Sequence, residues 1–220
     1  YYTAKNPTGI KEGYTKYVKG EEEYIPAGKA IEYTYDEKHC GVFPRMYSYD
    51  PSRPYHVQFY KYWIGKNQND ERKPTFGENL TYFFKYQVNF MYWRYFMWNF
   101  VGRQNDIQGH YFDNDGSRDY LNGNWISGID FIDEARLGPQ DNLPDYLANN
   151  KGRNTYFFLP LLLGLVGLFY HIKKNNKDAF IVFLLFFMTG LAIVVYLNQP
   201  PKQPRERDYA YAASFYAFAI

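Results

Sequence analysis

Residues 156–172 read YFFLPLLLGLVGLFYHI, and residues 179–197 read AFIVFLLFFMTGLAIVVYL. Neither run holds a charged side chain when His171 is neutral, and a membrane span needs about 20 apolar residues, within a range of roughly 17 to 25. The segment HIKKNNKD that joins them is short, so the two runs are expected to form a helical hairpin. A pair of helices buried in a soluble core would give the same pattern, but two such runs around so short a turn favour a membrane.

The composition of the whole chain excludes several classes of protein. Its 220 residues hold 25 Lys and Arg against 23 Asp and Glu, and this net charge of +2 gives no argument for a nucleic-acid partner. Aromatic residues make up 22% of the chain, which excludes a wholly disordered protein. The one cysteine, Cys40, excludes an intramolecular disulfide and a cysteine-cluster zinc site.

These patterns predict an α-helical polytopic membrane protein fragment with a mixed, loop-rich extramembrane region. We expect a fragment because the chain begins at Tyr1 and ends inside an apolar run. The predicted segments are an irregular extramembrane region with short strands (1–78), an aromatic amphipathic interfacial helix (79–103), an extramembrane loop region (104–154), a transmembrane helix (155–172), a cytoplasmic turn (173–178), a second transmembrane helix (179–198), an external charged loop (199–208) and the truncated start of a further transmembrane helix (209–220). Residues 1–154 are expected outside the cytoplasm.

The segment NLTYFFKYQVNFMYWRYFMWNFV, residues 79–101, is unusually rich in aromatic residues. One face of the expected helix carries large apolar side chains at spacings of 7, 3, 4 and 3, namely Phe83, Phe90, Trp93, Met97 and Phe100. Trp and Tyr prefer the boundary between membrane and water, so a helix lying in that interface fits the composition. An ordinary core helix of the external region is the alternative.

The segment NQPPKQPRERDYAY, residues 198–211, follows the second apolar run directly. Arginine binds phosphate through two parallel hydrogen bonds. Because the segment lies beside the expected bilayer, Arg205 or Arg207 is a candidate to hold the phosphate of a lipid. Glu206 or Asp208 is a candidate to orient an arginine or to act as a base. The structural alternative is a salt-bridged loop that anchors the helix ends.

No metal site, nucleotide-binding glycine loop or nucleophile elbow is predicted. The stretch from Asp113 to Gly116 suggests a calcium loop, but it lacks the terminal glutamate of that motif, so a solvated turn is the better interpretation.

Several long, ungapped motifs closely resemble one family of polytopic inner-membrane proteins of the Bacteroidetes group, the domain-of-unknown-function 2723 family. The motifs run from about Gly41 to the end of the chain, and they are GVFPRMYS, PTFGENL, MYWRYFMWNFVGRQND, GNWISGIDFIDEARLG, YFFLPLLLGLVGLFYH, TGLAIVVYLNQPPKQPRERDYAY and SFYAFAI. The family is similar to the protein O-mannosyltransferases, which are membrane glycosyltransferases of the C-type fold.

This resemblance implies an enzyme that moves a sugar such as mannose from a polyprenyl-phosphate carrier to Ser or Thr of exported proteins. It implies a multi-pass location in the bacterial inner membrane, with membrane lipids as further partners and no cofactor besides the donor. The catalytic acid is expected upstream, so the fragment is expected to be inactive alone. The candidate substrate-binding residues are Arg205, Glu206, Arg207, Asp208, Arg103 and Asp106. A non-enzymatic membrane scaffold with an aromatic-rich external surface is the alternative function.

Overall fold

The computed structural model describes residues 7–37, 40–47 and 52–220. Residues 1–6, 38–39 and 48–51 of the predicted region 1–78 lie outside the described residues. The elements are β1 (Gly9–Lys19), β2 (Tyr24–Thr34), α1 (Tyr55–Ile64), α2 (Phe76–Tyr82), the π-helix η2 (Phe83–Trp93), α3 (Arg94–Phe100), β3 (Gly102–Arg103), α4 (Asp130–Leu137), α5 (Asp145–Ala148), β4 (Asn154–Thr155), α6 (Leu159–Lys174), α7 (Asn176–Thr189), α8 (Leu191–Leu197), the 3-10 helix η3 (Asp208–Tyr211) and α9 (Ala212–Ala219).

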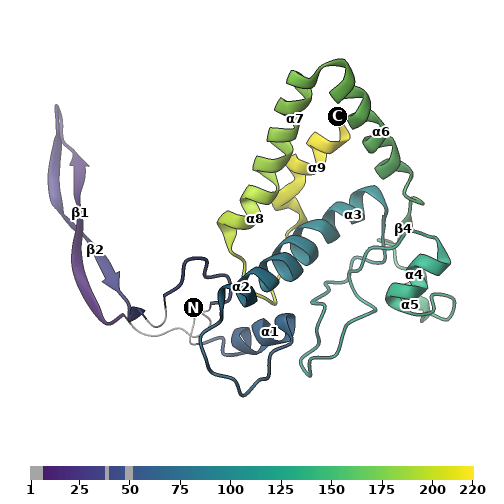
Figure 1. Cartoon of the computed structure of the whole chain (residues 1–220), viewed down its shortest axis with the longest axis horizontal. Helices are drawn as coiled ribbons and strands as arrows, with labels where there is room; N and C mark the ends of the chain where they lie inside the picture. Colours follow the sequence, from purple (N-terminus) through teal and green to yellow (C-terminus); the bar gives the residue numbers. More distant parts are fainter. Residues whose placement is uncertain (1–6, 38–39, 48–51) are drawn as a thin grey trace.

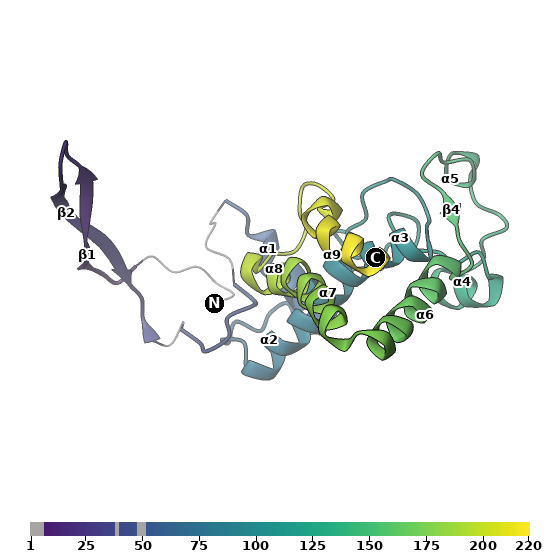
Figure 2. The ribbon, with the colours of Figure 1, turned by 90° about the horizontal axis from the view of Figure 1, so that it is seen from above.

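Strands β1 and β2 form an antiparallel hairpin that projects from the helical body, as Figures 1 and 2 show. Ion pairs across the strands join Lys11 to Glu32 and Lys29 to Glu12. The register shifts twice along the hairpin, and large side chains such as Tyr14 are exposed. The two strands therefore cover little of each other's apolar surface.

Helices α2, η2 and α3 run on from one another as a single long helix from Phe76 to Phe100 (Figure 1). A capping box starts it: the Glu78 N–H donates to Thr75 Oγ1 at 3.2 Å, and the Thr75 N–H donates to the Glu78 carboxylate at 2.7 Å. These two bonds satisfy donors that the first turn of a helix leaves without intrahelical partners. The middle of the helix widens into η2, and π-helical turns are rare and often occur at functional sites.

This long helix carries most of the aromatic core. On one side Trp63 of α1 packs against Tyr86 with ring centroids 5.0 Å apart, and Tyr86 stacks on Tyr82 at 5.1 Å. On the other side Tyr92 contacts Phe215 of α9 at 5.7 Å. The segment predicted as an interfacial helix over 79–103 is thus observed over 76–100, packed on both sides.

A narrow face of the long helix remains open, where Phe84 and Trp93 are 58% and 42% exposed. The helix ends at Phe100, and Gly102–Arg103 pairs with Asn154–Thr155 as the two-stranded sheet β3–β4. This pairing fixes the start of α6 next to the end of α3.

The predicted polytopic membrane fold is wrong. Phe157 and Phe158 adopt positive φ angles of 52° and 60°, so α6 begins only at Leu159 and has 16 residues. Among the described residues, only the helix Asn176–Leu197, which comprises α7 and α8, is long and apolar enough to cross a membrane. The further span predicted over 209–220 is a 3-10 turn and the eight-residue α9, which packs against α7 (Figure 1). The presence of only one candidate span among the described residues also contradicts the C-type glycosyltransferase-like architecture.

Candidate functional site

The loop 198–208 connects α8 to η3 and is fixed against the long helix formed by α2, η2 and α3. The hydroxyls of Tyr82 and Tyr86 donate to the carbonyls of Gln199 and Pro200 at 3.1 and 2.9 Å, and Gln87 Nε2 also donates to the Gln199 carbonyl at 3.0 Å. Three successive contacts from one helix thus hold the first half of the loop.

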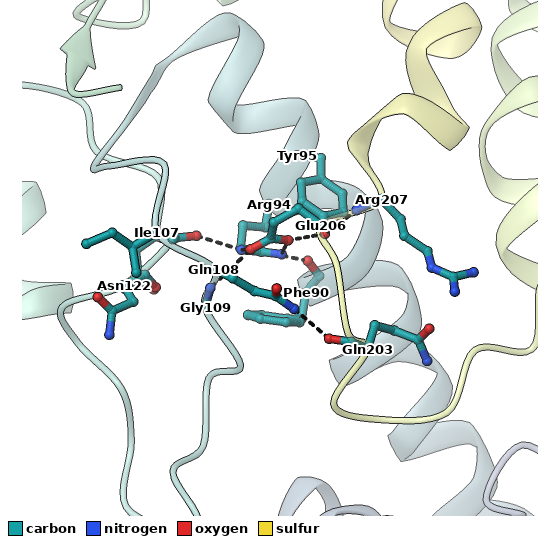
Figure 3. Close-up of polar contacts among 12 residues, drawn as sticks. Phe90, Arg94, Tyr95, Ile107, Gln108, Gly109, Asn122, Gln203, Glu206 and Arg207 are labelled. Atoms are coloured by element: carbon teal, nitrogen blue, oxygen red, sulfur yellow. Dashed lines mark hydrogen bonds and ion pairs between the residues drawn. The ribbon is translucent and has the colours of Figure 1, made fainter. Parts of the chain in front are cut away.

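An ion pair between Arg94 and Glu206 holds the second half of the loop, and Figure 3 shows the pair at the centre of a polar cluster. Arg94 Nη2 lies 2.8 Å from Glu206 Oε2, and the two side chains are 5% and 17% exposed. The Tyr95 hydroxyl donates to the same carboxylate oxygen, and the Gly109 N–H donates to Oε1 at 3.1 Å. Arg94 Nη1 donates in addition to the Gly123 carbonyl at 2.7 Å. The cluster therefore joins the long helix, the loop 198–208 and the loops at 109 and 123.

Glycine is required at position 123 because of this close approach. Gly123 has φ +60°, and a Cβ atom there would lie 2.8 Å from the Gly109 nitrogen and 3.0 Å from Arg94 Nη1. Any other side chain would thus be strained and would press on the guanidinium.

The electrostatics of the cluster keep Glu206 ionised. Burial alone would raise the pKa of Glu206, but the charge of Arg94 and the hydrogen bonds from Arg94, Tyr95 and Gly109 outweigh it and lower the pKa below its usual value. Burial raises the pKa of the Tyr95 hydroxyl, which stays protonated and donates. Glu206 is therefore ill suited to accept a proton as a general base, and it acts here as the anion that neutralises Arg94.

Two further cations line a small recess beside this pair. Lys202 and Arg205 share the recess with His110, Arg94 and Glu206. Because Arg94 and Glu206 neutralise each other, Lys202 and Arg205 leave the recess positively charged. Burial lowers the pKa of His110, and the charge of Lys202 acts in the same direction, so this imidazole is neutral at pH 7. The enclosed space is only about 10 Å³, room for about one water, so an anion would bind at the mouth of the recess.

Lys202 is itself held in place. Its ammonium donates to Asn114 Oδ1 and lies 4.6 Å from the centroid of the Phe59 ring. Arg205 is exposed and forms no ion pair with any side chain in the described ranges. The guanidinium of Arg205 is thus available to a ligand.

The structure does not gather all the residues that the sequence singled out. Arg205 and Glu206 line the recess, whereas the Arg207 side chain points away from the ion pair and only its backbone N–H donates, to the Tyr95 hydroxyl at 3.1 Å (Figure 3). Asp208 begins η3 and lines a separate pocket.

Arg103 and Asp106 lie apart from the loop 198–208. Arg103 sits 4.0 Å from the centroid of the Trp98 ring and donates to the Asn105 carbonyl at 2.9 Å, while Asp106 is exposed. Neither side chain lines the recess.

Sequence reasoning missed Arg94, Tyr95, His110 and Lys202. One signal was present, because a charged residue within an aromatic helix is costly to bury unless a partner is supplied. The partner, Glu206, lies 112 residues further along the chain, and no sequence spacing identifies it.

Comparison with known proteins gives one match, a family of unknown function (DUF8416), over residues 1–84. The matched part includes the hairpin, α1 and the start of the long helix, and it ends before the loop 198–208. No protein of curated function and no solved structure matches the chain. These findings support a likeness to an uncharacterised family over the first part of the chain, and nothing in them confirms the resemblance to the domain-of-unknown-function 2723 family or to glycosyltransferases.

Proposed function

We propose that the recess formed by Lys202, Arg205 and His110 binds the phosphate group of a membrane lipid. The full protein would use this lipid as the donor of a sugar for Ser or Thr of exported proteins. The observation that carries the proposal is the excess of positive charge in the recess: Glu206, the nearby carboxylate, is already neutralised by Arg94. A guanidinium and an ammonium without carboxylate partners favour an anion, and phosphate is the anion that arginine binds in a bidentate manner.

The position of the loop supports a lipid as the source of the phosphate. The loop follows the helix Asn176–Leu197, whose most apolar stretch has a mean hydropathy of 2.7 and is only 11% buried. Apolar side chains of α6 beside it, such as Leu163 and Phe169, are exposed by 72% and 65%. Exposed apolar surface of this extent marks a membrane or protein interface. We therefore propose an inner-membrane location in which this helix crosses the bilayer and the loop 198–208 lies on the outer side.

The residues of the site would act on charge rather than on a proton. In the bound donor, Arg205 and Lys202 would contact the phosphate oxygens, and they would stabilise the negative charge that grows on the phosphate as it leaves the sugar. Glu206 would position the loop through Arg94. The proton of the acceptor hydroxyl would be taken by a base outside this site.

Binding of full-length protein in nanodiscs to a polyprenyl phosphate tests the proposal, with the dephosphorylated alcohol as the comparison ligand. Removing one charge-assisted contact costs about 1.5 to 3 kcal/mol, so Arg205→Ala should weaken binding roughly tenfold to a hundredfold. Arg205→Lys should recover part of this loss because it keeps the charge. Lys16→Ala removes an exposed charge from the hairpin and serves as the matched control. Equal affinity for phosphate and alcohol, or wild-type affinity in Arg205→Ala, would reject the proposal.

A non-enzymatic scaffold is the second candidate function. The observation that favours it is the hairpin β1–β2, whose side chains Tyr14 and Tyr24 are 72% and 70% exposed and available to a partner. The two candidates use different parts of the molecule. Deletion of residues 9–34 should leave lipid-phosphate binding intact if the recess is the functional site, and failure of the recess to bind phosphate in the intact chain would favour the scaffold.

A further inference from the structure

Two arginines line a second pocket, which the proposed function does not use. Arg118 pairs with Phe112 in an isolated antiparallel β-bridge, and Arg136 lies in the last turn of α4. Together with Tyr120 and the end of α4, the two arginines line an open pocket of about 360 Å³. The pocket shares no lining residue with the recess at the loop 198–208.

Aromatic rings hold both guanidinium groups. Arg136 lies 3.4 Å from the centroid of Trp125, and its Nη1 donates to the Trp125 carbonyl at 3.1 Å. Arg118 lies 4.9 Å from the centroid of Tyr111 and 4.6 Å from that of Tyr120. A guanidinium stacked on a ring keeps the N–H groups along its edge available for oxygen ligands. The two arginines are therefore already ordered for binding.

The carboxylates near this pocket are occupied by other donors. Asp133 Oδ1 accepts from the backbone N–H of Ser127, and Asp133 Oδ2 accepts from the backbone N–H of Gly128, each at 2.8 Å. Asp119 accepts from the N–H groups of Leu121 and Asn122 at 2.9 and 3.0 Å.

The two guanidinium groups have no ion-pair partner in the part of the chain that the structure describes. Within residues 7–37, 40–47 and 52–220, neither Arg118 nor Arg136 forms an ion pair, and Arg118 Nε is buried without a hydrogen-bond acceptor. Burial lowers the pKa of Arg136 to about 10; Asp133 opposes the shift and the charge of Arg118 adds to it. Two neighbouring cations that share a pocket and have unused donors are expected to bind an oxyanion, because it would remove their mutual repulsion.

We infer that Arg118 and Arg136 form a binding site for a phosphate group. Each guanidinium offers a fork of parallel N–H donors, and the three terminal oxygens of a phosphate monoester can accept from both forks together. The phosphate could belong to a soluble ester or to a lipid headgroup, since both present the same oxygens.

Calorimetric titration of the full chain in nanodiscs with inorganic phosphate tests this inference, with chloride at equal ionic strength as the reference. An Arg205→Ala background removes the contribution of the other recess. Arg118→Gln and Arg136→Gln should each weaken phosphate binding by about tenfold or more, because each removes one charged fork. Arg118→Lys should bind more weakly than the wild type although it keeps the charge, and Lys16→Gln should bind as the wild type does.

The nanodisc lipid identifies the source of the phosphate. Stronger binding of added inorganic phosphate in phosphatidylcholine discs than in discs with phosphatidic acid would show that a lipid headgroup competes for the site, and equal binding would indicate a soluble ester. Unchanged phosphate affinity in Arg118→Gln or in Arg136→Gln would overturn the inference, as would phosphate binding that Arg205→Ala alone abolishes. Either of these two results would leave the proposed function standing, because that function rests on Lys202 and Arg205.

Discussion

Replacing Glu206 by glutamine tests the ion pair that holds the loop 198–208 to the long helix. The substitution keeps the shape of the side chain but leaves the guanidinium of Arg94, which is 5% exposed, without an anion. Removing one partner of a buried ion pair costs about 3 to 5 kcal/mol, and the partial exposure of Glu206 favours the lower end of that range. A loss of about 3 kcal/mol is a large part of the 5 to 15 kcal/mol that typically stabilises a domain.

Replacing Arg94 instead of Glu206 leaves the opposite charge of the ion pair without its partner. Arg94→Met removes the buried cation but leaves the Glu206 carboxylate with hydrogen bonds only from Tyr95 and Gly109. The double variant Arg94→Met with Glu206→Gln leaves no uncompensated charge, so it should lose less stability than the two single variants added together. The difference, a coupling energy of roughly 0.5 to 3 kcal/mol, measures the pair itself.

Denaturant unfolding of the full chain in detergent provides the assay, followed by the fluorescence of Trp98, whose ring lies 4.7 Å from the Arg94 guanidinium. Glu32→Gln is the matched control, because Glu32 pairs with Lys11 but both side chains are well exposed. Such surface pairs contribute at most about 1 kcal/mol. A loss below about 1 kcal/mol in Glu206→Gln, or strict additivity in the double variant, would refute the view that this ion pair anchors the loop.

Three further predictions concern pH, helix capping and topology. The folded pKa of Glu206 lies below its ordinary value of 4.5, so the ionised carboxylate stabilises the fold at pH values above 4.5. The free energy of unfolding should therefore fall as the pH drops through the folded pKa. An unfolding free energy of the wild type that stays constant in acid would contradict this expectation. Thr75→Ala should cost about 1 kcal/mol through loss of the capping box, whereas Thr81→Ala, within the same helix, should cost clearly less when both are measured by denaturant unfolding. In a cysteine-free background, Lys177→Cys and Tyr209→Cys stand at opposite ends of the helix 176–197 and should react with an impermeant maleimide from opposite sides of the membrane. Labelling of both from one side would argue against a crossing helix.

The sequence predicts the helices better than it predicts where they end. Apolar periodicity marks the long aromatic helix, and the length of the uncharged run marks the helix over 179–197. It does not reveal that the backbone at Phe157 and Phe158 adopts positive φ angles and shortens α6. Hydropathy alone counts these residues as part of a span, and the polytopic prediction failed for that reason.

Strand β1 was missed for a different physical reason. Its side chains alternate poorly between apolar and polar types, because register shifts interrupt the hairpin and no part of the body covers either face in the described chain. A half-buried strand shows a period of two, but a strand exposed on both faces need not.

The candidate site was predicted only in part. The sequence indicated the arginines of the loop 198–208 correctly as charged groups next to an apolar helix, and it left open whether they bind phosphate or anchor the loop. The structure divides these roles among neighbours: Glu206 anchors through Arg94, while Arg205 is exposed. A division of this kind depends on which way each side chain points, and adjacent residues in a loop give no periodic signal of direction.

The π-helix limits how the length of this chain can vary. Tyr82 and Tyr86 contact the beginning of the loop 198–208, and Arg94 contacts its end, so the rotation of the helix between these points must be correct. Deleting a single residue from η2 would turn everything after it, by about 100° in α-helical geometry and by somewhat less in the wider π-helix, and would carry Arg94 away from Glu206. Apart from Tyr86 and Gln87, which bond to the loop, substitutions within η2 can therefore be absorbed by local repacking, whereas insertions and deletions cannot. Variants of this protein that keep the loop in place should vary in residue type at the other positions of 83–93 while keeping the number of residues there constant.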